Sequence, residues 1–167
     1  MHGVQPLSGT VTGRHLSAVR KKLESYAARG IFRSYEEREG RSGCPEFHFV
    51  WLAEFPVTLV CDFERQTLTL RDLFTEIPSR SRLDADVRQF VRSREATALP
   101  APRRIDTGRA AVRCRNRNGK LSITLEVKDH QYRYAATKAV LLAQELFQEM
   151  SEHHVEYMGE QFNLSED

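Results

Sequence analysis

The sequence predicts an α+β fold in which an antiparallel sheet of about five strands carries its helices mainly on one face. Three observations support this prediction. Several short segments alternate apolar and polar residues, as half-buried strands do. Asn118-Gly119 separates two such segments and is typical of a tight hairpin turn. Segments near both ends of the chain carry apolar residues at helical spacing instead, so the expected order of elements is α-β-β-β(β)-α-β-β-α.

A first helix is expected over 13–29. Apolar side chains recur there at helical spacing from Leu16 through Leu23, while lysines and arginines occupy the opposite face. Thr12 is the expected N-cap, because its hydroxyl can accept a hydrogen bond from a free backbone N–H at the start of the helix. Gly30 is the expected residue just past the helix end, where a left-handed backbone conformation favours glycine.

Extended segments follow the first helix. The strongest is 46–53, in which Phe47, Phe49 and Trp51 share one face and the other face is also largely apolar. This pattern predicts a central strand, whose aromatic rings belong to the core rather than to an RNA-stacking surface. Further strands are expected over 31–38, from Pro56 onward and over 67–70.

The second half of the chain returns to helices around one hairpin. Ser81 is the expected N-cap of a second helix. Two alternating strands then form the hairpin, over 110–117 and 121–128. Asp129 is the expected N-cap of a long third helix, which carries an apolar stripe for packing against the sheet.

Size and composition indicate one domain over 1–167, with 1–12 and 159–167 as candidates for flexible ends. The chain is 40% hydrophobic and 29% charged, which is too apolar for a disordered protein. No stretch approaches the roughly 18 apolar residues of a membrane span, and the first residues lack the pattern of a signal peptide. Three cysteines, odd in number and far apart, favour a reducing compartment. We therefore expect a cytoplasmic protein that contacts no membrane.

Charge is unevenly distributed along the chain. Residues 79–120 hold twelve basic and four acidic side chains, a local charge of +8. Residues 121–167 hold three basic and nine acidic side chains, a local charge of −6. This separation fits either an anionic partner for the middle of the chain or pairing of the middle with the acidic tail, within one chain or between two.

The element order also resembles a known family. The segment Phe-Pro-Val-Thr-Leu-Val-Cys-Asp over 55–62, leading to Thr-Leu-Thr-Leu over 67–70, resembles the YbjN-like proteins and the type III secretion chaperone-like fold. The resemblance spans roughly 14–156, although the Pro-Ala-Pro linker near residue 101 is longer than that family's usual connection. It implies a non-enzymatic protein, often dimeric, that engages another polypeptide, and it supplies no functional residues.

An arginine series on the first hairpin strand is the candidate anion-binding site. Strand periodicity places Arg113, Arg115 and Arg117 on one face, with Arg109 and Lys120 nearby. Each guanidinium could contact a phosphate through two hydrogen bonds. The alternative is a solvated outer sheet face, or a row paired with acidic helix residues. That face carries no aromatic residue for stacking on single-stranded nucleic acid, which favours the alternative.

The long helix and the tail after it supply candidate partner contacts. Leu141 and Leu142 leave the main apolar stripe of the helix. They contact either a neighbouring helix of the same chain or a second subunit, because uncovered apolar patches on soluble proteins tend to be interaction sites. Tyr157, Met158 and Phe162 add apolar groups that could dock on the sheet or on a second subunit.

The sequence carries no catalytic, metal-binding or cofactor motif. His153 and His154 are adjacent on a helix and point about 100° apart, so they cannot readily share an ion. The cysteines lack zinc-ligand spacing. A dispersed enzyme site, for example Asp62 with His48 or His130, is the third hypothesis. The first is a non-enzymatic protein-binding module acting as a homodimer, and the second is a nucleic-acid or anionic-surface binder that uses the arginine series.

Overall fold

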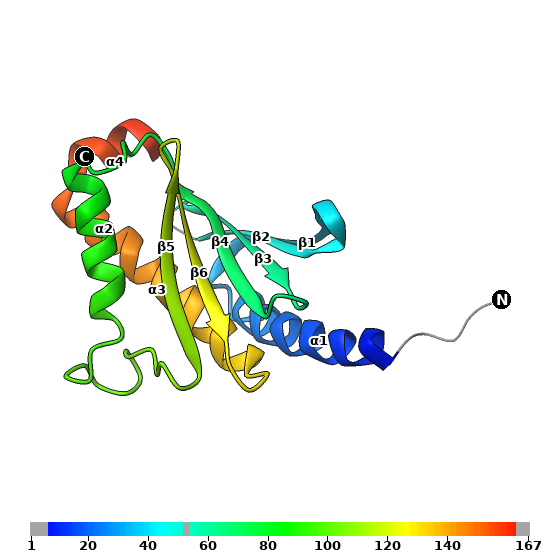
Figure 1. Cartoon of the computed structure of the whole chain (residues 1–167). Helices are drawn as coiled ribbons and strands as arrows, with labels where there is room; N and C mark the ends of the chain where they lie inside the picture. The colour runs from blue at the N-terminus through cyan, green and yellow to red at the C-terminus, as the bar shows by residue number, and fades with distance from the viewer. Residues whose placement is uncertain (1–6, 52–53, 163–167) are drawn as a thin grey trace.

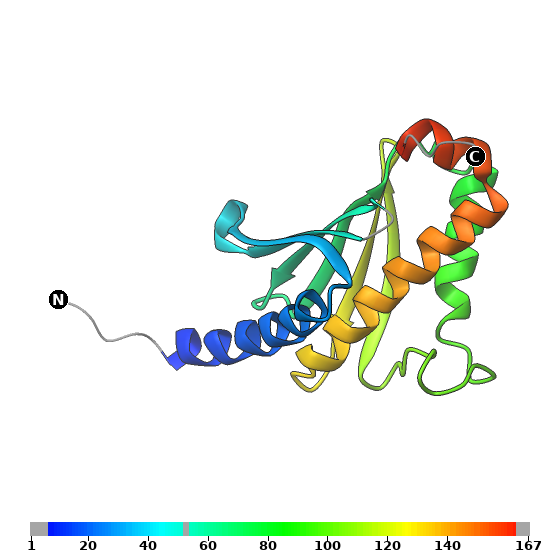
Figure 2. The same cartoon turned by 180° about the vertical axis from the view of Figure 1, so that it is seen from behind.

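The structure, a computed structural model, describes residues 7–51 and 54–162 and confirms the predicted α+β fold. Six antiparallel strands, against the five or so expected, form one open sheet in the order β1-β2-β3-β4-β6-β5. Figure 1 looks onto the face that α1 and α3 leave uncovered, and Figure 2 looks onto these two helices. The elements are α1 (Leu7–Ala28), β1 (Phe32–Glu39), a 3-10 turn (Arg41–Gly43), β2 (Pro45–Trp51), β3 (Pro56–Asp62), β4 (Thr67–Phe74), α2 (Arg82–Ser93), β5 (Ala110–Arg117), β6 (Lys120–Val127), α3 (Tyr132–His153) and α4 (Val155–Phe162).

Helix α1 ends as predicted and begins earlier than predicted. Gly30 has φ +74°, and its N–H donates to the carbonyl of Ala27 at 3.0 Å. The N–H of Ile31 donates to the carbonyl of Tyr26 at 3.1 Å, which completes a Schellman motif. The prediction of Thr12 as N-cap is wrong, because the helix already begins at Leu7.

The two faces of the sheet differ in composition. Phe47, Phe49 and Trp51 of β2 are buried beneath the helices, as predicted. The other face of β2 carries Glu46 and His48 and has no helix over it. β2 is an interior strand paired with β1 and β3, as predicted, but helices cover only one of its faces. Its apolar residues fill one face of an ordinary one-sided sheet.

The β5–β6 hairpin closes through the predicted turn. Asn118 and Gly119 have φ of +54° and +86°, as a type I′ turn requires of both central residues. The carbonyl of Gly119 accepts a hydrogen bond from the N–H of Ile77 at 3.0 Å. This bond ties the hairpin turn to the segment between β4 and α2, so both lie at the same end of the sheet.

Helix α2 is fastened to the edge strand β5. Ser81 is its N-cap, as predicted, and accepts a hydrogen bond from the N–H of Asp84 at 3.2 Å. The buried Asp84 side chain accepts from Asn116 of β5 at 2.9 Å. Arg88 donates to the carbonyl of Cys114 at 3.0 Å. These contacts hold α2 beside the sheet edge in Figure 1.

Helix α3 is the centre of the helical layer. It packs on β4 and β6 and contacts α1 and α2 as well. Its predicted stripe is buried from Tyr132 to Met150. The prediction of Asp129 as its N-cap is wrong. Gln131 occupies that position without a side-chain capping bond, and Asp129 lies in a turn with φ +50°. None of the helices in the described ranges has the length and apolarity needed to cross a bilayer.

Candidate functional site

A groove of about 730 Å³ runs between α2 and the last turns of α3. Its floor is apolar and consists of Val87 and Phe90 from α2 with Leu146 and Met150 from α3. Phe90 is half-buried, and the other three are buried. The volume of this groove lies within the usual range of roughly 300–1,000 Å³ for ligand pockets.

The rim of this groove, the α2–α3 groove, is polar. His154 follows the last residue of α3 and lies 3.0 Å from Asp86 of α2, measured between Nε2 and Oδ2. His153 turns instead toward Glu149, at 3.4 Å. The two histidines therefore point apart, as their adjacency predicts. An apolar floor inside a polar rim is the arrangement expected of a surface that buries a partner's apolar side chains.

The position of α2 creates the groove. Its contacts with β5 run along one side of the helix, through Asp84 and Arg88. Positions 82, 86, 89, 90 and 93 follow the other side at helical spacing and face α3 across the gap. The sequence predicts that α2 is an amphipathic helix. It cannot indicate which side of the helix packs against the sheet edge and which side faces the groove.

The predicted partner contacts on the long helix and tail divide into two groups. Leu142 and Met158 have relative exposures of 2% and 0% within the single chain, so neither offers a surface to a partner, and their assignment as contacts is wrong. Leu141 is half-buried, and so are Tyr157 and Phe162. Contacts within the same chain, the alternative to contacts with a second subunit, therefore account for the burial of Leu142.

The tail docks on the end of the sheet through α4. The hydroxyl of Tyr157 donates to the carbonyl of Thr75 at 2.5 Å, and burial raises the pKa of Tyr157 to about 12. The ring of Phe162 meets Phe55 edge to face, with ring centroids 5.4 Å apart. Helix α4 thus completes the core at that end, which was one of the two predicted alternatives for the tail.

The predicted anion-binding residues lie in two places. Arg113, Arg115 and Arg117 are exposed on the uncovered face, where strand periodicity placed them. Arg113 pairs with Glu126 at 2.6 Å. Arg109 precedes β5 at its opposite end, where its guanidinium lies 3.7 Å from the ring centroid of Tyr134. Arg109 is therefore not part of one row with the others.

Within residues 7–51 and 54–162, three cations near the hairpin turn form no ion pair. They are Arg115, Arg117 and Lys120, which we call the basic row. Arg117 and Lys120 are cross-strand neighbours, as are Arg115 and Ser122. The row is exposed on the uncovered face of the sheet beside the turn.

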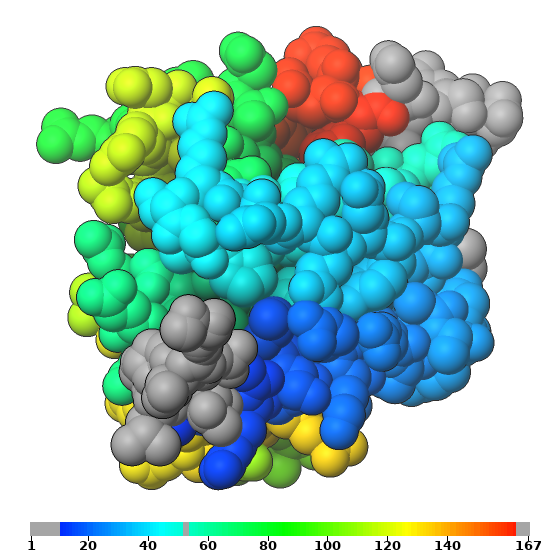
Figure 3. Space-filling model, turned by 90° about the vertical axis from the view of Figure 1, so that its right-hand side faces the viewer, coloured from blue at the N-terminus to red at the C-terminus, as the bar shows by residue number. Residues whose placement is uncertain are grey.

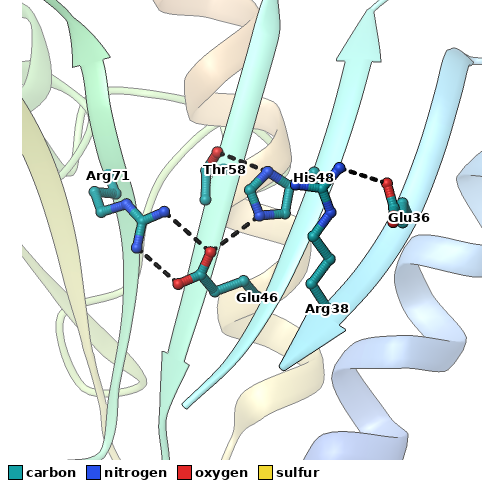
Figure 4. A network of polar contacts seen from close by, with 6 residues as sticks. All are labelled: Glu36, Arg38, Glu46, His48, Thr58 and Arg71. Carbon is teal, nitrogen blue, oxygen red and sulfur yellow. Dashed lines mark hydrogen bonds and ion pairs between the residues drawn. The ribbon is translucent and has the colours of Figure 1, made fainter. Parts of the chain in front are cut away.

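A network on the uncovered face was not predicted (Figure 4). Glu46 accepts two hydrogen bonds from Arg71, at 2.7 and 3.0 Å, and lies 3.0 Å from Nε2 of His48. Its side chain is only 9% exposed. A Cβ atom on Gly40 would lie 2.3 Å from its carboxylate, so the β1–β2 turn closes over it only because residue 40 is glycine. The bonds from Arg71 lower the pKa of Glu46.

The same network has the connectivity of a nucleophile, base and orienting acid. Nδ1 of His48 lies 3.3 Å from the hydroxyl of Thr58, while Nε2 faces Glu46. Arg71, however, occupies both oxygens of that carboxylate. The grooves described for this chain are lined by other residues. The arrangement therefore fits a cross-strand polar network better than a reaction centre.

The residues suggested for a dispersed enzyme site have separate partners. Asp62 accepts a hydrogen bond from the N–H of Arg65 at 3.0 Å. His48 contacts Glu46 and Thr58. His130 stacks on His15, with ring centroids 5.0 Å apart. The structure shows no hydrogen bond from Asp62 to His48 or His130 among the contacts of the described residues.

One group of side chains has metal-ligand geometry. Glu149, Glu152 and His153 place one ligand atom each within 4.8 Å of the others on the last turn of α3. Two of the three are exposed, and exposed acidic groups are common without an ion. The ion pair between His153 and Glu149 accounts for part of the cluster.

Comparisons with known protein families, with curated proteins and with solved structures found no match. The likeness in element order to YbjN-like proteins and type III secretion chaperones stays a prediction. The function proposed below therefore rests on the surfaces of this chain, among them the α2–α3 groove.

Proposed function

We propose that the protein is a non-enzymatic binding module that holds an apolar segment of another polypeptide in the α2–α3 groove. The observation that carries this proposal is an apolar floor of four side chains inside a rim of charged and polar groups. Phe90 is the one half-buried residue of this floor, so a partner's apolar side chains would contact Phe90 chiefly, and the rim would bond to their flanking polar groups.

The shape of the groove supports a helical or extended peptide as the ligand. It lies between two helices, and amphipathic helices commonly bind in such grooves through apolar residues at positions i, i+3 or i+4, and i+7. A chaperone-like role, which the resemblance in element order implies, is consistent with this kind of contact.

A groove-filling variant tests the proposal. Gln89 is exposed and lines the groove, so Gln89→Trp would place an indole in the space that the ligand needs. Arg92 is exposed on the same helix and does not line the groove, so Arg92→Trp is the matched control. Peptides selected from a random display library on the wild-type protein would be measured by fluorescence anisotropy against all three proteins.

We expect Gln89→Trp to weaken binding of the selected peptides at least tenfold, a loss of about 1.4 kcal/mol. Arg92→Trp should leave the affinity unchanged. NMR amide shifts caused by the peptide should map to α2 and the end of α3. If the library yields no binder, or if the binders tolerate Gln89→Trp, the groove is not the ligand site.

A further inference from the structure

We infer that a second copy of this chain docks through two oppositely charged patches that lie beside each other at one end of the molecule. One patch is the basic row, Arg115, Arg117 and Lys120. The other is a hollow that is rich in acidic side chains, formed between α4 and the segment before α2. This contact uses different charged residues from peptide binding in the α2–α3 groove, although the two hollows adjoin at His153 and His154.

The acidic hollow measures about 760 Å³. Three exposed glutamates line it, Glu76 from the segment after β4 and Glu156 and Glu160 from successive turns of α4. None of the three forms an ion pair within the part of the chain that the structure describes. Their charges are therefore free for cations of a partner.

Val155 gives the acidic hollow an apolar component. Its side chain is 58% exposed and lines the same hollow as the glutamates. Among the described side chains, only Val155 and Val11 are large apolar groups that are exposed to this degree. Covering Val155 would add burial of apolar area to the attraction between charges, which alone contributes little at an exposed surface.

The basic row offers the complementary charges at a regular spacing. Arg115 and Arg117 are alternate residues of β5, so their side chains leave the same face about 6.7 Å apart. Lys120 lies directly across the hairpin from Arg117. Three cations on one flat face can meet three carboxylates around a hollow.

The two patches adjoin because the hairpin turn is bonded to the segment that carries Glu76. The N–H of Ile77, the next residue, donates to the carbonyl of Gly119 at 3.0 Å. Figure 1 shows the β5–β6 turn and α4 at the same end of the molecule, and the yellow turn and red α4 also lie at the upper end of Figure 3. Neighbouring patches of opposite charge suit a two-fold dimer, in which each patch meets its opposite on the other copy.

Ion pairs within the chain involve only some of the charged residues of the basic segment 79–120 and the acidic segment 121–167. Arg94 and Arg103 approach Glu145 at 2.6 and 3.8 Å, and Arg113 pairs with Glu126. The basic row and the hollow glutamates remain after these pairs are formed. Pairing of the basic middle with the acidic tail thus occurs partly within one chain, and the basic row and the hollow glutamates are among the groups that it leaves for a second copy.

A long polyanion fits the same surface less well. Such a ligand would run from the basic row toward Glu76 at one end and toward Glu126 at the other. Glu76, which forms no ion pair among the described residues, would repel phosphates, whereas Glu126 is already paired with Arg113. The residues beside the row on β6 are Ser122 and Thr124, which offer no ring for stacking on bases.

A charge-swap experiment tests the inference. One double variant carries Arg115→Glu and Arg117→Glu, and the other carries Glu156→Arg and Glu160→Arg. Sedimentation velocity at low salt should show a dimer for the wild type and monomers for each variant alone, with a dissociation constant raised at least about tenfold. An equimolar mixture of the two variants should form a heterodimer, because one contact is restored with reversed charges and the other is unchanged.

The matched control is the double variant Lys21→Glu with Arg133→Glu. Both residues are exposed and lie outside both patches, and the change in net charge equals that of the first variant. This control should remain a dimer, and circular dichroism should show the same fold for all proteins. High salt should dissociate the wild-type dimer, because screening weakens exposed charge pairs.

Two results would overturn the inference. The first is a wild-type protein that sediments as a monomer at high concentration. The second is a mixture of the two variants that stays monomeric. Retention of a monomeric wild type on a DNA oligonucleotide column, lost in the Arg115 and Arg117 variant, would assign the basic row to nucleic acid instead. Peptide binding in the α2–α3 groove should be unchanged in both charge variants, because none of the four substituted residues lines it, so failure here leaves the proposed function standing.

Discussion

The two faces of the sheet are built from the same strands but differ in the side chains that they carry: one face is apolar and buried, and the other is polar. Beneath the helices, Phe47 and Phe49 of β2 are buried in a continuous aromatic and aliphatic core. On the opposite face, Glu46 and His48 of the same strand join a chain of hydrogen bonds across β2, β3 and β4. Period-two alternation produces this separation, because successive side chains leave opposite faces of a strand.

The comparison indicates that the two faces have separate tasks. Burial of apolar area on the covered face stabilises the fold. Polar pairs on the uncovered face help to fix the register between neighbouring strands. They also allow that face to contact water without a second layer of helices. Substitutions on the covered face should therefore cost far more stability than those on the uncovered face.

The largest effect is expected for Phe147→Ala on the covered side. Phe147 is 2% exposed, stacks on Phe55 with centroids 4.3 Å apart and meets Phe74 edge to face at 5.3 Å. Removing this ring leaves a cavity, so we expect a loss of about 3–5 kcal/mol in the free energy of unfolding. Urea titration followed by tryptophan fluorescence measures it. Val11→Ala, at an exposed position, is the control and should change stability by less than about 0.5 kcal/mol.

A smaller effect is expected for Glu46→Gln, which weakens the network of the uncovered face. Loss of the charged hydrogen bonds to Arg71 should cost about 1–3 kcal/mol at pH 7. The native pKa of Glu46 is lowered by Arg71, so its contribution is complete above the ordinary carboxyl pKa of 4.5 and is lost as pH falls through the lowered value. The stability difference between wild type and variant should therefore shrink below pH 4.5.

Unfolding titrations of both proteins between pH 3 and pH 7 measure this difference. Glu36→Gln is the control on the same face, because Glu36 is exposed and pairs only with Arg38. It should have little effect at any pH in that range. A difference for Glu46→Gln that stays constant down to pH 3 would contradict the assigned role of its charge.

The smallest effect is expected for Thr69→Val on the uncovered face. Its hydroxyl lies 3.0 Å from that of Thr124 across β4 and β6. Cross-strand pairs of this kind contribute about 0.2–1 kcal/mol. A double-mutant cycle with Thr124→Val measures the coupling. A cost that approaches the one for Phe147→Ala would indicate that this face is covered in solution by another molecule.

Local signals in the sequence predicted the features that depend on one or two residues. Gly30, Ser81 and the Asn118-Gly119 turn were predicted correctly, because each is fixed by backbone conformation or by a capping bond a few residues away. Thr12 failed as a cap because α1 already begins at Leu7, so Thr12 lies inside the helix. Asp129 failed because it adopts a left-handed turn conformation, which Asp tolerates.

The candidate site could not be predicted in the same way. The α2–α3 groove depends on Arg88 and Asp84 reaching β5 across 26 and 32 residues of sequence. Helical periodicity placed Leu142 outside the main apolar stripe but could not reveal that contacts within the chain bury it. The basic row was predicted in part, because strand period alone places Arg115 and Arg117 together. Its position beside Glu76 follows from a single bond between distant segments.

The bond from Arg88 to the carbonyl of Cys114 bears on how this chain avoids aggregation. The terminal strands of an open sheet present unpaired backbone groups that can recruit strands from other molecules. At β5, a guanidinium occupies one such carbonyl. At the other end, five of the eight residues of β1 are charged, which opposes the approach of an identical strand. Continued growth of the sheet into a fibre is thereby disfavoured, and association is directed to side-chain surfaces that close after one partner has bound.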